Sequence, residues 1–190
     1  MPMLESAPMP LPVSEVEREL THTRRVRYEG YKRSDGLWDI EAHLLDTKNH
    51  DYQLKTGVRR AGQPIHDMWV RVTIDRKFNV VAAEASMDAV PYPGGCEQIA
   101  PAYKKLVGLN LIRGFRKHTH ELFGNVKGCT HLTEMLAGLP TAAIQTFAGE
   151  NKEERDDGAK PFQLDQCHAL ETSTETVKVW YPKWFRGKAA

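Results

Sequence analysis

Alternating apolar and polar positions predict β-strands in the first half of the chain. Residues 37–45 alternate with a period of two, as expected for a strand with one face in a core and the other in water. Residues 24–31 precede them, and Asp35-Gly36 between the two segments tolerates the positive φ angles of a tight turn. We therefore predict a β-hairpin. His43 falls on the polar side of its second strand and is expected to be an exposed residue, not a ligand.

A second hairpin is predicted from residues 68–74, which alternate, and residues 78–87, which return after a short turn. After Cys96 the apolar residues recur at helical spacing as far as residue 148. A break is expected near Gly138 and Pro140, because an interior proline removes a helical hydrogen bond. The predicted fold class is α+β, with an N-terminal antiparallel sheet of two hairpins followed by a helical layer.

The two ends of the chain have patterns of their own. Residues 1–14 contain four prolines and predict a flexible N-terminal arm, which leaves residues 15–190 as a single α+β domain. Near the other end, residues 176–181 are rich in β-branched and aromatic side chains. We expect them to form an edge strand that Pro182 ends.

Composition excludes some functions. With 26 basic and 25 acidic residues the formal charge is +1, so no net field attracts nucleic acid or an anionic membrane. No stretch is long and apolar enough to span a bilayer, and the start of the chain does not resemble a signal peptide. The protein is therefore expected to be cytoplasmic. Its three cysteines do not form the dense pattern of a disulfide framework.

Two of these cysteines suggest a metal site. Cys96 and Cys129 each follow a glycine at the predicted start of a helix, where unpaired backbone N–H groups stabilise a thiolate. Asp67, His66 and His131 complete a set of thiolate, carboxylate and imidazole ligands that suits zinc, and thiolates can also hold an iron–sulfur cluster. The alternative is that both cysteines are small buried side chains and that His131 only begins a helix.

One geometric condition limits this site. In a regular strand His66 and Asp67 point to opposite faces. Both can bind one metal ion only if Pro64 holds them in a loop before the strand begins.

Several sequence strings resemble a bacterial family known only as domain of unknown function 2889. They include the segments at residues 24–28, 35–39 and 128–132. A fainter resemblance is to iron–sulfur scaffold proteins of the IscU and NifU type, in which an aspartate precedes a β-hairpin, a Gly-Cys follows it and a later cysteine opens a helix. Asp67, Gly95-Cys96 and Cys129 follow that order, although Ile65 stands where the scaffolds have a cysteine.

These patterns lead to three hypotheses about function. The first is a zinc-binding or iron-binding protein, either a small metalloenzyme or a protein that handles metal centres, with Asp67, Cys96, Cys129 and His66 as ligands. In it, His66 or His131 would carry protons. The second is a metal-free thiol enzyme with Cys129 as nucleophile. The third is a non-catalytic binding module. The expected partner is a small-molecule substrate or another protein, and a homodimer is left open.

Overall fold

The computed structural model describes residues 11–148, 160–161 and 163–187. The chain divides into two compact units, residues 1–146 and residues 147–190, which are described separately. A compact unit is not necessarily one that folds alone, so the single domain expected from residue 15 onward stays a prediction.

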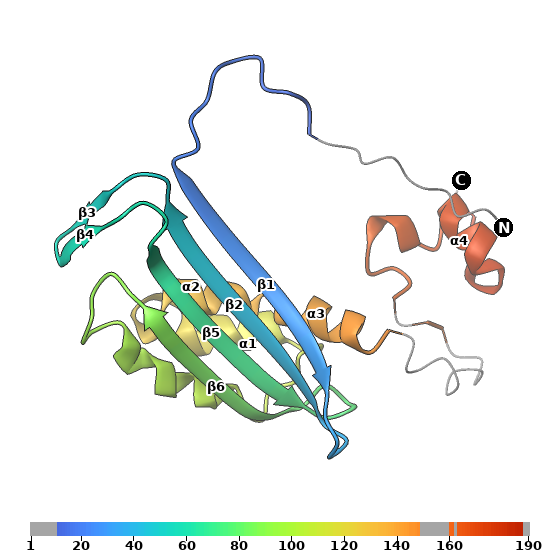
Figure 1. Ribbon diagram of the computed structural model, residues 1–190. Helices are drawn as coiled ribbons and strands as arrows, with labels where there is room; N and C mark the ends of the chain where they lie inside the picture. The colour runs from blue at the N-terminus through green and yellow to red at the C-terminus, as the bar shows by residue number, and fades with distance from the viewer. Residues whose placement is uncertain (1–10, 149–159, 162, 188–190) are drawn as a thin grey trace. The chain divides into compact units, whose positions relative to one another are not determined.

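The first unit contains the predicted antiparallel sheet (Figure 1). Its strands lie in the order β1, β2, β5 and β6, and each pairs with its neighbour in antiparallel register. Their bounds are β1 (His22–Lys32), β2 (Trp38–Lys48), β5 (Pro64–Ile74) and β6 (Val80–Ala89). A small separate hairpin, β3 (Tyr52–Leu54) and β4 (Gly57–Arg59), lies between β2 and β5 in the chain.

Helices follow the sheet in the chain and cover one of its faces. They are the 3₁₀ helix η1 (Glu97–Leu106), α1 (Phe115–Phe123), the 3₁₀ helix η2 (Asn125–Lys127), α2 (Thr130–Leu136) and α3 (Leu139–Thr146). The helix α2 packs on β2 and β5, and α3 packs on β1 and β2. In Figure 1 the sheet is seen from its open face, with α1 and α2 behind it. The α+β prediction is confirmed.

The covered face is the one that the sequence alternation indicates. Its side chains on β2 and β5 are almost completely buried: Ile40, Ala42, Leu44, Met68, Val70, Val72 and Ile74. The predicted helix break is also present, because α2 ends at Leu136 and α3 begins at Leu139, with Pro140 in its first turn, where proline is tolerated.

The second unit differs from the prediction. It contains the 3₁₀ helix η3 (His168–Leu170), α4 (Glu175–Trp180) and the 3₁₀ helix η4 (Pro182–Trp184). The expected edge strand at residues 176–181 is therefore wrong. The hydroxyl of Thr174 accepts a hydrogen bond from the backbone N–H of Val177 and caps α4, and this local signal outweighs the β-propensity of the segment. None of the described helices is both long and apolar enough to cross a bilayer.

Candidate metal centre

Three potential metal ligands meet on the helix-covered side of the sheet. They are Asp46 on β2, His66 on β5 and His131 on α2, and one ligand atom from each lies within 4.8 Å of the other two. Asp46 and His66 are direct cross-strand partners in the register of β2 and β5. His131 comes from the first turn of α2, which packs over both strands.

The position of Asp46 follows from the alternation of β2. Asp46 is two residues beyond Leu44, so the pleat turns it towards the covered face, and only 3% of its surface is exposed. An isolated buried carboxylate is costly, and its neighbours must compensate for the water that it loses.

Arg24 provides most of that compensation. Its Nε and Nη2 donate to the two carboxylate oxygens of Asp46, each at 2.8 Å. His66 Nδ1 lies 3.0 Å from one of these oxygens, and His22 Nε2 lies 3.2 Å from the other. Arg24 also donates from Nη1 to Glu134 on α2, at 2.8 Å, so one guanidinium connects the sheet to the helix that carries His131.

These contacts keep the carboxylate charged, whereas burial favours neutral imidazoles. Burial opposes ionisation of Asp46, but its bonds with Arg24 and His66 outweigh burial and lower its pKa to about 2. Burial lowers the pKa of His66, and the neighbouring His131 lowers it further. Burial also lowers the pKa of His131, with a further contribution from Arg24. A neutral imidazole has the free lone pair that a metal needs.

The geometry is close to that of a metal site. The His66 and His131 rings have their centres 3.9 Å apart and are tilted by 33°. Bond lengths of about 2.0–2.2 Å to nitrogen and oxygen place tetrahedral ligand atoms about 3.3 Å apart. The three ligand atoms here lie within 4.8 Å of one another, so the side chains would have to move together to share one ion. One carboxylate and two imidazoles suit zinc or iron(II).

Two of the residues singled out in the sequence, His66 and His131, belong to this cluster, whereas Asp67 does not. The strand β5 already begins at Pro64, so His66 and Asp67 alternate and point to opposite faces. The carboxylate of Asp67 lies 2.7 Å from Nε2 of His43 on the open face. His43, expected to be an exposed strand residue, is instead half-buried and stacked on Trp69, with ring centres 3.9 Å apart.

The cysteines are not members of this cluster. Cys96 and Cys129 are half-buried free thiols at the starts of η1 and α2. The backbone N–H of Cys129 donates to the hydroxyl of Tyr103 at 3.0 Å, which fixes this helix start. Among the described residues, no cysteine belongs to a group of three or more potential ligands, and no cysteine cluster suited to iron–sulfur binding is present.

The sequence analysis did not identify Asp46 as a candidate ligand, although the alternation of β2 contains an indication of it. A charged residue stands in phase with Trp38, Ile40, Ala42 and Leu44, where the pattern demands an apolar one. A break of this kind on a core face is a sign of a buried polar site.

Comparisons with known proteins place the chain in a family. No curated protein and no solved structure matches it. Neither comparison therefore supports the resemblance to iron–sulfur scaffolds. A family model described as a protein of unknown function, DUF2889, matches residues 22–145, which is more than half of the chain. The protein belongs to the DUF2889 family.

Proposed function

We propose that the protein binds one divalent transition-metal ion, zinc or iron(II), through Asp46, His66 and His131. The observation that carries the proposal is the meeting of a buried carboxylate and two imidazoles from three separate elements within 4.8 Å. Within the same network Arg24 holds the carboxylate in its charged form, and burial favours neutral imidazoles. These shifts favour the protonation states that metal binding requires.

Three protein ligands leave a coordination position for water or substrate, as in catalytic metal sites. Zinc would lower the pKa of a bound water and provide a nucleophile near neutral pH, whereas iron(II) held by two histidines and a carboxylate suits oxygen chemistry. The proposed role is therefore a small metalloenzyme with a small-molecule substrate.

The test is metal binding by matched variants of α2. Metal content is measured after purification without chelator, and affinities for zinc and for iron(II) are then measured under anaerobic conditions. His131→Ala should weaken binding by more than about 100-fold, beyond the 10–100-fold effect of removing a group that only supports a ligand.

Cys129→Ser is the control, because it lies two residues from His131 at the start of the same helix and outside the cluster. It should change the affinity by less than about twofold, since a removed ligand or supporting group costs far more. The opposite result, with Cys129→Ser losing metal and His131→Ala keeping it, would overturn the proposal and assign the ion to the cysteines.

A further inference from the structure

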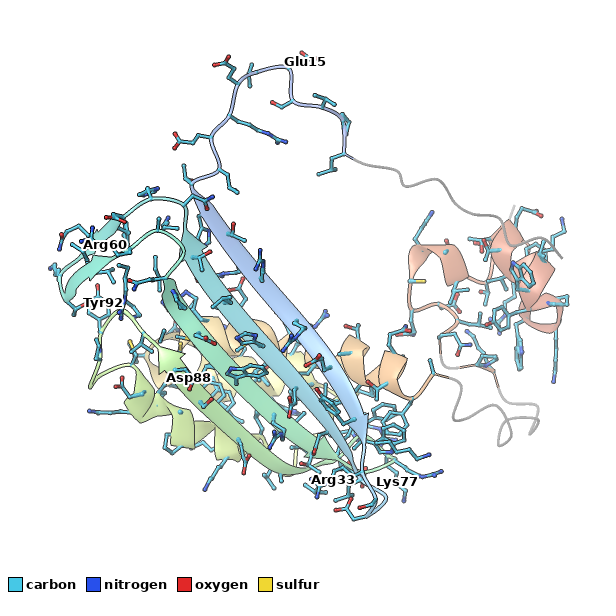
Figure 2. The ribbon with its side chains drawn as sticks, viewed as in Figure 1. Glu15, Arg33, Arg60, Lys77, Asp88 and Tyr92 are labelled. Atoms are coloured by element: carbon cyan, nitrogen blue, oxygen red, sulfur yellow. The ribbon has the colours of Figure 1, made fainter. Side chains whose placement is uncertain are left out.

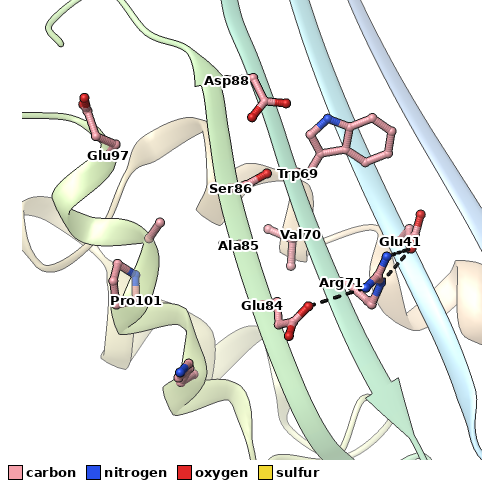
Figure 3. Close-up of a pocket in the computed structure, with 12 residues that line it drawn as sticks. Glu41, Trp69, Val70, Arg71, Glu84, Ala85, Ser86, Asp88, Glu97 and Pro101 are labelled. Atoms are coloured by element: carbon pink, nitrogen blue, oxygen red, sulfur yellow. Dashed lines mark hydrogen bonds and ion pairs between the residues drawn. The ribbon is translucent and has the colours of Figure 1, made fainter. Parts of the chain in front are cut away.

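The open face of the sheet carries a groove, which lies beside Asp88 in Figure 2 and is enlarged in Figure 3. The helix η1 packs along β6 and forms one wall, and the exposed sides of β2, β5 and β6 form the floor. The volume is about 930 Å³, within the range of small-molecule sites, about 300–1,000 Å³. The groove is therefore large enough to hold a small ligand.

An indole ring forms part of the lining. Trp69 on β5 is half-buried, and its ring stacks on His43 with the ring centres 3.9 Å apart. The carboxylate of Asp67 lies 2.7 Å from Nε2 of His43, so the imidazole that supports the indole is itself held in place. On β6 the direct cross-strand partner of Trp69 is Ser86, which is too small to cover the ring. The groove thus presents a fixed aromatic surface.

This aromatic surface attracts positive charge. The face of an aromatic ring carries partial negative charge, and tryptophan binds cations best of the aromatic side chains. One cation is already close, because the guanidinium carbon of Arg27 lies 5.7 Å from the centre of the Trp69 ring. Arg27 comes from β1, which is on the side of the sheet away from β6, and it is not part of the groove lining. The groove side of the indole therefore has room for a second cation.

Two carboxylates flank the indole along β6. Glu84 and Asp88 lie two residues before and two residues after Ser86, and both line the groove. A strand rises about 3.3 Å per residue, so their backbones are about 13 Å apart, with the pair of Ser86 and Trp69 between them. Figure 3 shows both carboxylates on the same face as the indole. The groove therefore contains a row of carboxylate, indole and carboxylate.

Both carboxylates can accept a ligand. The side chain of Asp88 makes no hydrogen bond or ion pair with the described part of the chain. Glu84 lies 3.5 Å from Nη1 of Arg71, but Arg71 is held more closely by Glu41, which is 2.6 Å from its Nη2. The charged residues of the lining are four carboxylates and two cations: Glu41, Glu84, Asp88, Glu97, Arg71 and Lys104. The groove thus favours a positively charged ligand.

The spacing of the carboxylates argues against a single metal ion. An ion binds its oxygen ligands at about 2.0–2.6 Å, and side chains whose backbones are about 13 Å apart cannot both reach it. Among the described residues, no group of three or more potential metal ligands lies in the groove. An elongated organic cation can instead place one positive group at each carboxylate and another at the indole.

We propose that this groove binds a linear aliphatic polyamine, in which ammonium groups alternate with short methylene chains. The terminal ammonium groups would pair with Glu84 and Asp88, and an inner ammonium group would lie against Trp69. The methylene groups would contact Ala100 and Pro101 on the wall formed by η1. This inference goes beyond the metal site and does not depend on it.

Spermidine and hexaamminecobalt(III) test the proposal on the full chain. The two cations have the same charge, but only spermidine is a linear chain with methylene groups. Affinities are measured by isothermal titration calorimetry at low salt, where charge attraction is least screened. Spermidine should bind at least about tenfold more tightly, since only spermidine can bury methylene groups and span the two carboxylates. Equal affinities would show that the groove only attracts counterions and would overturn the proposal.

Variants of the lining test the two kinds of contact separately. Glu84→Gln/Asp88→Asn should weaken spermidine binding by at least about fivefold, because two ion pairs are lost. Trp69→Leu should weaken it by at least about threefold, because it removes the cation–π contact and keeps an apolar side chain. Glu121→Gln, which alters an exposed carboxylate on α1, is the control and should leave the affinity unchanged. Unchanged affinity in the groove variants would contradict the proposal.

Fluorine NMR locates the bound ligand. The chain contains four tryptophans, and after labelling with 5-fluorotryptophan the signal of Trp69 is the one that Trp69→Leu lacks. Spermidine should shift this signal. A shift of another tryptophan signal without this one would place the ligand elsewhere and overturn the proposal. Tighter binding of trilysine than of spermidine would also overturn it, because the groove would then be assigned to a basic segment of a partner protein.

Discussion

Asp46 shows how a single charged side chain can occupy a core position. Its two oxygens are hydrogen-bonded to Arg24, His22 and His66. These bonds replace the hydrogen bonds to water that the carboxylate loses on burial. In the described residues, no buried side-chain nitrogen or oxygen lacks a hydrogen-bond partner. Removing one member of such a network leaves its partners buried without hydrogen bonds. The resulting loss of folding stability is larger than the stability that the bond itself contributes.

The lowered pKa of Asp46 predicts a pH-dependent stability in metal-free protein. Its folded pKa of about 2 lies below the ordinary value of 3.8, so the charged form stabilises the fold above about pH 4, and this contribution is lost as pH falls towards 2. Asp46→Asn should lower the free energy of unfolding by about 2 kcal/mol at pH 7.

Urea unfolding with chelator present, at pH 7, 4 and 2.5, measures this difference. The difference in free energy of unfolding between Asp46→Asn and the unchanged protein should decrease steadily as the pH falls. Asp88→Asn, which alters an exposed carboxylate, is the control and should show little difference at any pH. A gap for Asp46→Asn that is constant over the whole range would contradict the assignment.

The helix α3 lies very close to β1, and glycine makes this approach feasible. A side-chain carbon added at Gly30 on β1 would overlap the Thr146 side chain at the end of α3. A carbon added at Gly138, just before α3, would overlap the ring of Tyr28 on β1. These two glycines therefore set the distance between the helical layer and this side of the sheet.

Gly30→Ala should consequently destabilise the protein by about 1–3 kcal/mol, the usual effect of overpacking. Thr146→Ala in the same chain should recover part of the loss, because it removes two of the three atoms that the new carbon meets. Gly95→Ala is the control, since a carbon there makes only an ordinary contact of 3.6 Å. Thermal unfolding measures the stability of all three variants. Equal losses of stability for Gly30→Ala and Gly95→Ala would show that the close approach of α3 to β1 is unimportant.

The elements that the sequence predicts best are those whose periodicity reflects burial. In β2 and β5 apolar and polar residues alternate because one face of the sheet is covered, and the sequence alone shows this alternation. The strand assigned to residues 176–181 is wrong because a six-residue helix is decided by its cap, Thr174, more than by the propensity of its interior.

The candidate site could be predicted only in part, because it depends on register. His66 and His131 are visible as candidates, but their partner Asp46 is 20 positions before His66 and becomes its neighbour only through the pairing of β2 with β5. The hairpin of β3 and β4 lies between these two strands in the chain, and their pairing has a bulge directly after Asp46. Neither is specified by alternation alone.

In the whole molecule, the sheet, its covering helices and the candidate metal centre all belong to one unit. The family match over residues 22–145 falls inside this unit, which comprises residues 1–146. The three proposed ligands and Arg24, which supports them, also lie within it. The second unit, residues 147–190, contributes none of these groups.

A chain that ends at Ala148 should therefore fold and keep its metal affinity. This end point preserves α3 and the buried side chain of Phe147, which directly follows it. The expected result is a single cooperative unfolding transition and a zinc affinity within about threefold of the full chain, because no ligand or supporting group is removed. Calorimetry and zinc titration of the two chains measure these properties, and His131→Ala should weaken binding by more than about 100-fold in the shortened chain, as predicted for the full one. If the shortened chain unfolds without cooperativity, residues 149–190 are part of the folding unit and the chain is one domain from residue 15 onward.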